Sequence, residues 1–415
     1  MQSQKNIQIL VETMTRCAGN CSGCALSSFE RMNTSFDFDN FANKTQMIAE
    51  LLLPVNPDEI ESVTIFLGQG DHFLMEHQDI DRFVEYCSQM VPEHLKAKTM
   101  VFITASAIGK SQMIAEKMQQ FYQSSIKYRI PFFIQVVFDP KKMMVNDKFK
   151  DIYLKNILGF KNTFGMTEVT INMGNDLFET MSAKEFHEWV KEYGFKHIEM
   201  NWVLNQHTHK MWQTSSEKMF AWLEDWLLLY KQEPVYEINF IPFLGRAFLH
   251  KTQPIMQLKD KISEDLRNNL YIDYDGNIMF SQMGIISNLT PFGERLQHQK
   301  YALEDIDDKS REQSRKIMNR ILRHPTCGSC EFKNICATSG SVAWFDYPDN
   351  VDNHNQEDDV CPWNIKSFLQ FYEKEFVQQT NKDYFKTAFD KNPVQSSHLK
   401  VHNNEIYDYF EEKFI

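Results

Sequence analysis

The segment Cys17-Ala-Gly-Asn-Cys21-Ser-Gly-Cys24 decides how the rest of this sequence is interpreted. It directly follows a short apolar run, Ile7–Glu12, which predicts a β-strand, so the three cysteines lie on the loop that leaves the C-terminal end of that strand. Three thiolates can hold a [4Fe–4S] cube and leave one of its irons open to a substrate or cofactor. A zinc or disulfide site is the alternative, but a tetrahedral zinc site needs a fourth ligand nearby, and none follows closely.

The composition of the 415-residue chain is that of a large folded protein with two or three domains. Its 42% hydrophobic and 13% aromatic residues are ample for a core. The net charge of −12 argues against nucleic acid as a partner, because nucleic-acid surfaces need basic patches. No apolar run approaches the length of a membrane span and no signal peptide is evident, so we expect a cytoplasmic protein without membrane contact.

The eight cysteines are expected to be metal ligands rather than disulfides in the cytoplasm. Seven of them fall in two clusters, which supports this interpretation. The eighth, Cys87, stands alone in a helical pattern, and we predict that it is a buried small hydrophobic residue.

Strand and helix patterns alternate between residue 7 and about residue 240. The predicted strands are Ile7–Glu12, Ser62–Leu67, Met100–Thr104, Phe132–Phe138, Glu168–Met173 and His197–Leu204. The amphipathic helices between them include Asn43–Leu53, Ile80–Met90, Ser111–Ile126 and Asp147–Leu158. Such alternation predicts parallel strands joined by right-handed crossovers, with the chemistry at the C-terminal ends of the strands.

Two helix starts have the spacing of a capping box, Ser182 with Glu185 and Thr214 with Glu217. Gly194 suits the end of the helix that begins near Ser182, because glycine tolerates the left-handed backbone that often ends helices.

The CxxxCxxC spacing after a first strand resembles the signature of the radical S-adenosylmethionine (SAM) enzymes. The resemblance implies an α/β fold with a partial (β/α)6 TIM-like barrel, in which a [4Fe–4S] cluster held by Cys17, Cys21 and Cys24 binds SAM at its open iron. By the same resemblance, one electron cleaves SAM and the resulting 5′-deoxyadenosyl radical abstracts a substrate hydrogen. The family usually has an aromatic residue before the third cysteine; Gly23 stands there in this sequence, so the adenine contact must come from elsewhere.

The second predicted strand ends in Gln69-Gly70-Asp71, a partial match to the GGE motif that holds the amino group of SAM in this family. Glycine would permit backbone approach to the ligand, and Asp71 could accept a hydrogen bond from the ammonium group. An ordinary glycine-rich turn after a strand is the alternative.

Two later strand ends allow weaker assignments. The resemblance places Asp139 near the SAM ribose and Asn172 against the adenine, and a solvated loop is the alternative for each. The pair Lys141-Lys142 could meet the SAM carboxylate, although we favour a solvated loop for these lysines. The segment His207-Thr-His209 has ligand-like residue types and is a further candidate for contact with substrate.

A second group of cysteines follows a predicted hairpin with the turn Asp275-Gly276. The combination resembles the SPASM extension of radical SAM enzymes that modify peptides, including anaerobic sulfatase-maturating enzymes. By that resemblance one auxiliary [4Fe–4S] cluster is held by four thiolates, those of Cys327, Cys330, Cys336 and Cys361. Such a cluster has no open iron, so its role would be electron transfer or fastening of the domain. Zinc on the same thiolates is the alternative.

The extension's inner cluster is missing, because Ser281 and Gly340 stand where its cysteines are expected. We therefore predict a radical SAM core barrel over residues 1–245, a small cysteine-rich iron–sulfur domain, SPASM-like, over 246–365, and a helical C-terminal extension over 366–415.

The resemblance implies a radical SAM enzyme that abstracts hydrogen from a peptide or protein side chain during peptide maturation, with an electron donor such as flavodoxin or ferredoxin. Because the first strand begins at Ile7, we expect peptide recognition to use the second domain, the C-terminal region or a separate protein. One alternative is a radical SAM enzyme that acts on a small metabolite. Another is a non-catalytic module with zinc on four cysteines.

Overall fold

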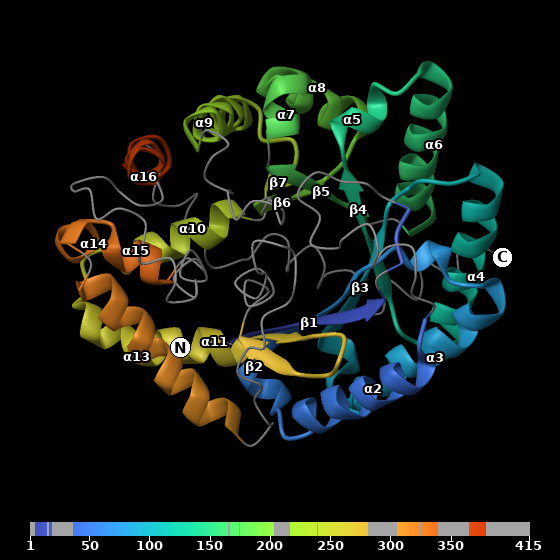
Figure 1. Ribbon diagram of the computed structural model, residues 1–415, viewed down its shortest axis with the longest axis horizontal. Helices are drawn as coiled ribbons and strands as arrows, with labels where there is room; N and C mark the ends of the chain where they lie inside the picture. The colour runs from blue at the N-terminus through green and yellow to red at the C-terminus, as the bar shows by residue number, and fades with distance from the viewer. Residues whose placement is uncertain are drawn as a thin grey trace.

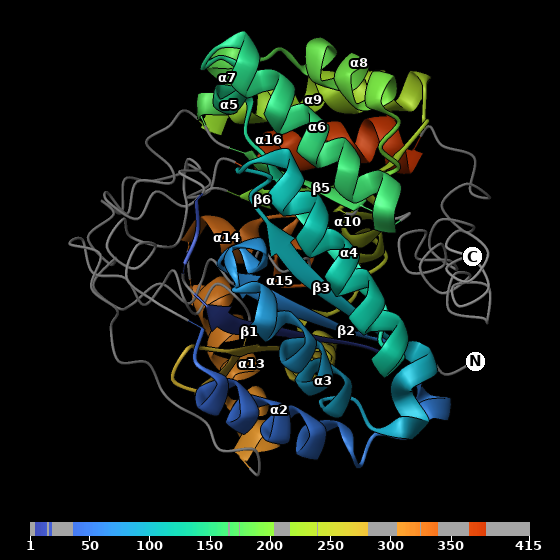
Figure 2. The ribbon, with the colours of Figure 1, turned by 90° about the vertical axis from the view of Figure 1, so that its right-hand side faces the viewer.

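In the computed structural model of the protein, the described residues are 5–14, 16–18, 36–164, 167–173, 175–202, 216–238, 240–280, 305–323, 325–338 and 365–378. They form a curled β-sheet whose convex side is covered by helices (Figures 1 and 2). The α/β class and the partial TIM-like barrel predicted from the sequence are confirmed.

The sheet contains nine described strands in the order β7-β6-β5-β4-β3-β2-β1-β8-β9. From β1 to β7, each strand runs parallel to the strand that precedes it in the sequence. The strands are β1 (Lys5–Met14), β2 (Ile60–Gln69), β3 (Thr99–Ala105), β4 (Phe132–Phe138), β5 (Thr167–Met173), β6 (His197–Trp202), β7 (Glu237–Ile238), β8 (Asn269–Ile272) and β9 (Ile278–Phe280).

Long helices of the described residues cover the convex side of the barrel sheet (Figure 2). They are α2 (Phe38–Leu52), α3 (Ile80–Gln89), α4 (Ser111–Tyr128), α6 (Asp147–Phe164), α8 (Ala183–Tyr193) and α9 (Ser216–Gln232). Two short helices, α5 (Pro140–Met143) and α7 (Asn175–Thr180), follow β4 and β5. The later helices are α10 (Phe240–Phe248), α11 (Lys259–Asn268), α13 (Ile306–Arg323), α14 (Pro325–Ser329), α15 (Lys333–Thr338) and α16 (Lys366–Tyr372).

The helix ends follow the local signals in the sequence. The Ser182 hydroxyl accepts a hydrogen bond from the Glu185 amide, and the Glu185 carboxylate accepts one from the Ser182 amide. This capping box is therefore confirmed. Gly194 ends α8 with a φ of 66°. Thr214 lies outside the described residues. Helix α2 begins five residues earlier than predicted, because the Asp37 carboxylate caps the amides of the first helical turn.

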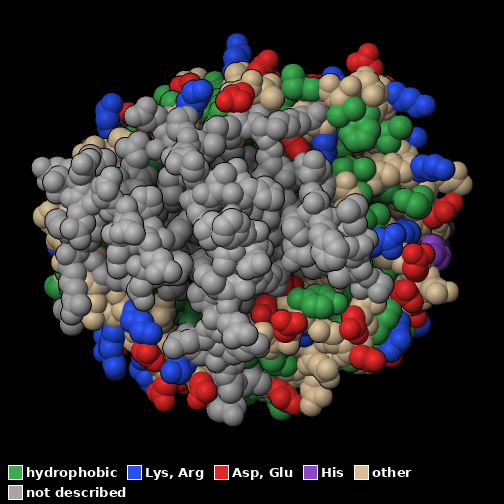
Figure 3. All heavy atoms as spheres, viewed as in Figure 1, with side chains coloured by type: hydrophobic (Ala, Val, Ile, Leu, Met, Phe, Trp, Pro, Cys, Tyr) green, Lys and Arg blue, Asp and Glu red, His purple; other side chains and the backbone are tan. Residues whose placement is uncertain are grey.

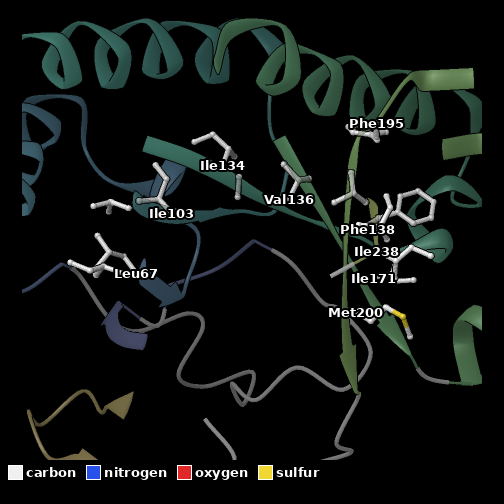
Figure 4. Close-up of a cluster of buried hydrophobic side chains, with 14 of the residues drawn as sticks. Leu67, Ile103, Ile134, Val136, Phe138, Ile171, Phe195, Met200 and Ile238 are labelled. Atoms are coloured by element: carbon white, nitrogen blue, oxygen red, sulfur yellow. The ribbon is translucent and has the colours of Figure 1, made fainter. Parts of the chain in front are cut away.

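The two faces of the barrel sheet bury different side chains. Alternate residues, such as Leu67, Ile103 and Val136, point towards the covering helices and form the main core (Figure 4). On the concave face, Phe102 stacks on Phe66 with ring centroids 4.7 Å apart and lies 5.2 Å from the Phe133 ring. We call these three rings the aromatic floor of the barrel.

The predicted hairpin is present, and its first strand extends the barrel sheet. Gly276, with a φ of 85°, closes the turn between β8 and the antiparallel β9. Strand β8 pairs in parallel with β1, on the side of β1 that does not face β2. The strand that leads to Cys17 is therefore flanked on both sides by parallel neighbours.

Helices after β7 build a second, smaller packing unit at the open side of the barrel (Figure 1). Ile262 of α11 packs there with Ile317 and Ile321 of α13. Helix α16 is fixed to α10, because the Tyr372 hydroxyl donates to the Ile241 carbonyl at 2.8 Å.

The described helices and the face seen in Figure 3 bear on the expectations for membrane and nucleic-acid contact. None of the described helices is long and apolar enough to cross a bilayer. Around the rim of the face seen in Figure 3, basic and acidic side chains of the described residues are interspersed.

Candidate functional site

Cys17 lies just beyond the C-terminal end of β1, as the sequence predicts, with its thiol partly exposed. The chain that leaves β2 pairs with the chain that enters the cysteine loop. The Gly70 amide donates to the Met14 carbonyl at 2.8 Å, and the Asp71 amide donates to the Arg16 carbonyl at the same distance. These two bonds fix the start of the loop. Cys21 and Cys24 lie outside the described residues.

Gly70 is required by the closeness of this pairing. A Cβ atom at position 70 would lie 2.6 Å from the Arg16 carbonyl oxygen and 2.7 Å from the Met14 carbonyl oxygen. Real Cβ atoms essentially never approach backbone that closely. Glycine at position 70 lets the chain after β2 lie close to the backbone of Met14 and Arg16. This is a separate role from the predicted close approach of the backbone to a ligand.

The Asp71 carboxylate is bonded inside the protein. The side chain is 2% exposed, its Oδ1 accepts from the Phe73 amide at 3.0 Å, and its Oδ2 accepts from the Ser106 hydroxyl. Burial raises the pKa of Asp71, while the bond from Ser106 and, more weakly, the charge of Lys142 act against that rise. The carboxylate thus ties the loop after β2 to the loop after β3, and its role towards the SAM ammonium stays a prediction.

His72 joins the ends of three strands through a chain of hydrogen bonds. The Thr13 hydroxyl donates to the Gly68 carbonyl at 3.0 Å, so it accepts from His72 Nε2 at 2.8 Å. His72 Nδ1 then accepts from the Thr104 amide at 3.3 Å. The ring is fully buried, and this burial lowers the pKa of His72 to about 4. His72 is therefore a neutral residue that holds β1, β2 and β3 together near the C-terminal end of β1.

We expect His72 to make the protein less stable in mild acid. The pKa of His72 is about 4 in the folded state, whereas an unperturbed histidine, as in the unfolded chain, has a pKa of 6.5. Between pH 4 and pH 6.5, only the unfolded chain therefore takes up this proton. Stability contributed by the neutral ring is complete above pH 6.5 and is lost as pH falls towards 4, by up to about 3 kcal/mol. The measurement is the thermal midpoint at pH 7 and pH 4.5 for wild type and His72→Gln.

The variant should show a smaller drop in midpoint than wild type between these two pH values. His77→Gln, which changes an exposed histidine five residues further along the chain, is the matched control and should keep the wild-type drop. An equal drop in His72→Gln and wild type would contradict this role of His72.

Lys142 differs from the sequence prediction. We expected a solvated loop at Lys141-Lys142, but Lys142 is only 6% exposed, because helix α5 begins directly after β4 and turns the segment inward. Its ammonium lies 5.6 Å from the centre of the Tyr153 ring. A buried cation at the C-terminal end of β4 favours an anionic group nearby.

The remaining predicted residues of the SAM site lie at neighbouring strand ends. Asp139 directly follows β4; its side chain is 5% exposed and its amide donates to the Tyr153 hydroxyl at 3.1 Å. Asn172 lies near the end of β5, and its side chain, like those of Gln69 and Lys141, is outside the described set. The segment His207-Thr-His209 is also outside it.

Three cysteines of the second group lie in or next to two short helices after α13. Cys327 is in α14, Cys330 follows it, and Cys336 is in α15. The Cys330 amide donates to the Cys327 carbonyl at 3.1 Å, and the Phe332 amide donates to Cys330 Sγ at 3.4 Å. Amide bonds to sulfur stabilise a thiolate, so this turn suits a thiolate ligand of iron–sulfur or zinc.

The three described thiols do not by themselves form a complete metal site. Within the ranges that the structure describes, no three Cys, His, Asp or Glu side chains are grouped closely enough to hold a metal ion. The predicted fourth ligand, Cys361, is outside those ranges. Cys87, in contrast, is fully buried in α3 and burial raises its thiol pKa, which confirms its prediction as a core residue.

Sequence reasoning missed the structural roles of His72 and Ser106. The only local signal for His72 was its place directly after the Gln69-Gly70-Asp71 segment. Its partners Thr13 and Thr104 come from two other strands, so the network depends on strand order rather than on local pattern.

Comparison with known proteins finds similar structures but no similar sequence. No protein-family model matches the chain, and no curated protein matches it in sequence. Several solved structures match it over most of its length, and three of them are described next.

A structure of native anSMEcpe, an anaerobic sulfatase-maturating enzyme, with bound AdoMet and the Cp18Cys peptide is 11% identical, with a TM-score of 0.56 over 90% of this chain and 98% of that chain. A histidine-tagged form of anSMEcpe with bound AdoMet is 11% identical, with a TM-score of 0.58 over 96% and 99%. Streptococcus suis SuiB bound to precursor peptide SuiA is 12% identical, with a TM-score of 0.54 over 86% and 75%. The chain has the fold of these proteins, so the predicted resemblance to radical SAM enzymes with a SPASM extension is confirmed at the level of the fold.

Proposed function

We propose that this protein is a radical SAM enzyme that modifies a peptide or protein side chain. The observation that carries the proposal is the position of Cys17, the first cysteine of the CxxxCxxC segment, at the C-terminal end of β1 in this partial barrel. Proteins of the same fold have been solved with AdoMet and with peptides, which supports the choice of both ligands.

Cys17, Cys21 and Cys24 would hold the first [4Fe–4S] cluster. When bound and reduced by a donor such as flavodoxin or ferredoxin, this cluster would supply the electron that splits AdoMet into methionine and a 5′-deoxyadenosyl radical, which takes a hydrogen atom from the substrate. The chain's own contribution is to fix the start of the loop, through the Gly70 and Asp71 amides.

AdoMet would lie over the strand ends, between Gln69-Gly70-Asp71 and the later positions Asp139 and Asn172. Lys142 is a further group for the AdoMet carboxylate, since its buried ammonium lies near Asp71 at the same end of the barrel. A buried ammonium at this end of the barrel would attract the carboxylate of a zwitterionic ligand.

The second cysteine group, Cys327, Cys330, Cys336 and Cys361, would hold one auxiliary [4Fe–4S] cluster, with zinc as the alternative. We retain the boundaries 1–245, 246–365 and 366–415 for the three parts, and a cytoplasmic location. A small metabolite as substrate is the second candidate function, and a non-catalytic zinc module is the third.

Iron content tests the number of clusters. After anaerobic reconstitution, we expect about eight irons and eight sulfides per chain, falling to about four in the Cys327→Ala/Cys330→Ala double variant. Both proteins should form 5′-deoxyadenosine from AdoMet with dithionite in at least trace amounts. Cys87→Ala, which removes a core thiol, is the matched control and should retain about eight irons.

Other results of these measurements would support the zinc, non-catalytic or small-metabolite alternatives. About four irons together with one zinc in wild type would make the second group a structural zinc clamp and remove the auxiliary cluster from the proposal. Iron-free protein with zinc, and no 5′-deoxyadenosine, would support the non-catalytic module. Dependence of 5′-deoxyadenosine formation on a small metabolite rather than a peptide would support the second candidate.

A further inference from the structure

Three polar side chains meet on the concave face of the barrel sheet. They are Gln135 of β4, Thr170 of β5 and Glu199 of β6. Thr170 lies directly opposite Glu199 in the pairing of β5 with β6. The flanking residues of β6, Ile198 and Met200, pack in the core on the helix side, so Glu199 points into the barrel.

Glu199 is oriented by the other two side chains. Its Oε2 accepts from Gln135 Nε2 and, at 3.3 Å, from the Thr170 hydroxyl. Gln135 and Glu199 belong to strands separated by β5, and their side chains meet because the sheet curls around its concave face. Both donors are neutral, so they direct the carboxylate without cancelling its charge.

Glu199 forms no ion pair among the described residues, whereas two other carboxylates of the barrel strands have a basic group close by. The charge of Glu12 acts on the buried ammonium of Lys44. Glu237 Oε2 lies 3.1 Å from His197 Nδ1. Within the described part of the chain, no ion pair reaches Glu199.

The surroundings of Glu199 strengthen any charge interaction. Phe133, part of the aromatic floor, lies on the same face of β4 as Gln135 and precedes it by two residues. Thr170 is fully buried, and Glu199 is half-buried. In such a partly apolar interior, a carboxylate attracts a cation more strongly than it would in water.

We propose that Glu199, oriented by Gln135 and Thr170, binds a positively charged group of the substrate, an ammonium or a guanidinium, inside the barrel. This inference rests on the proposed function, because it takes the barrel interior as the place of the substrate. It narrows the substrate to a peptide with a cationic side chain or amine near the reacting position. Glu199 Oε1 is the acceptor, since Oε2 already takes two bonds.

The test compares the binding of small probes that have nearly the same shape but differ in charge. Binding of n-butylguanidinium, n-butylammonium and neutral n-butylurea to the anaerobic holoenzyme is measured by saturation-transfer NMR at physiological ionic strength. We expect the cations to bind wild type at least about 10-fold more tightly than the urea. In Glu199→Gln that preference should vanish, and in Glu199→Asp, which keeps the charge, it should persist.

Glu192→Gln removes an exposed carboxylate from α8 and is the matched control for net charge; it should keep the wild-type preference. Equal binding of cation and urea to wild type, absence of binding by all three probes, or a preference retained in Glu199→Gln would each overturn the proposal. Formation of 5′-deoxyadenosine is measured on the same wild-type preparation. Its presence without cation preference would overturn this inference alone, and its absence would overturn the proposed function.

Discussion

Replacement of Cys17 by alanine is expected to abolish reductive cleavage of AdoMet. Cys17 is one of three predicted ligands of the first cluster and is held in place by the pairing of the chain after β2 with the chain after β1. Loss of a group that merely orients a metal ligand typically lowers metal affinity or activity by about 10–100-fold. Loss of a ligand itself should therefore lower activity by more than about 100-fold. The measurement is 5′-deoxyadenosine formed from AdoMet with dithionite under anaerobic conditions.

Iron analysis accompanies this experiment. Cys17→Ala should lose the irons of the first cluster and retain those of the second group, so about four of eight remain. Cys87→Ala changes a thiol that is fully buried in α3 and should retain both iron and activity. Activity of Cys17→Ala near the wild-type level would remove the cysteine loop from the proposed chemistry.

Substitution of Gly70 by alanine is expected to have the second largest effect. The added Cβ would lie 2.6 Å from the Arg16 carbonyl oxygen and 2.7 Å from that of Met14, and both obstacles are backbone atoms that cannot rotate away. Either the strand ends separate or the two amide bonds that fix the cysteine loop break. Overpacking of this kind lowers the free energy of unfolding by about 1–3 kcal/mol.

Gly68→Ala is the matched control, because no atom outside its chain neighbours lies within 4 Å of a Cβ at position 68. We expect Gly70→Ala to unfold at a lower temperature than wild type and to hold fewer irons after reconstitution, while Gly68→Ala matches wild type in both. Full iron content and wild-type stability in Gly70→Ala would show that the loop does not depend on this close approach.

The order of elements was predictable from the sequence because hydrophobic periodicity is local. Strand β4 was predicted with its observed bounds, Phe132–Phe138, since five of its seven residues are buried and mostly apolar. The capping box at Ser182 and the turn at Gly276 were predictable for the same reason, as each depends on residues within a few positions.

The candidate site was predictable only where a motif marked it. Cys17 and Gly70 were found from spacing and position, whereas the network of His72 and the orientation of Glu199 were not. Each of these requires partners from two other strands, Thr13 and Thr104 for His72, so strand order must be known first. The burial of Lys142 was mispredicted because two adjacent lysines after a strand usually indicate a solvated loop.

The pairing of β8 with β1 sets the order in which the protein can be completed during synthesis. Strand β1 ends at Met14, but its second neighbour begins only at Asn269, so about two-thirds of the chain must leave the ribosome before β1 is paired on both sides. Until then the strand that carries the cysteine loop offers a row of unpaired amides and carbonyls, which invites pairing with other chains. A nascent or truncated chain that stops before residue 269 is therefore prone to aggregate.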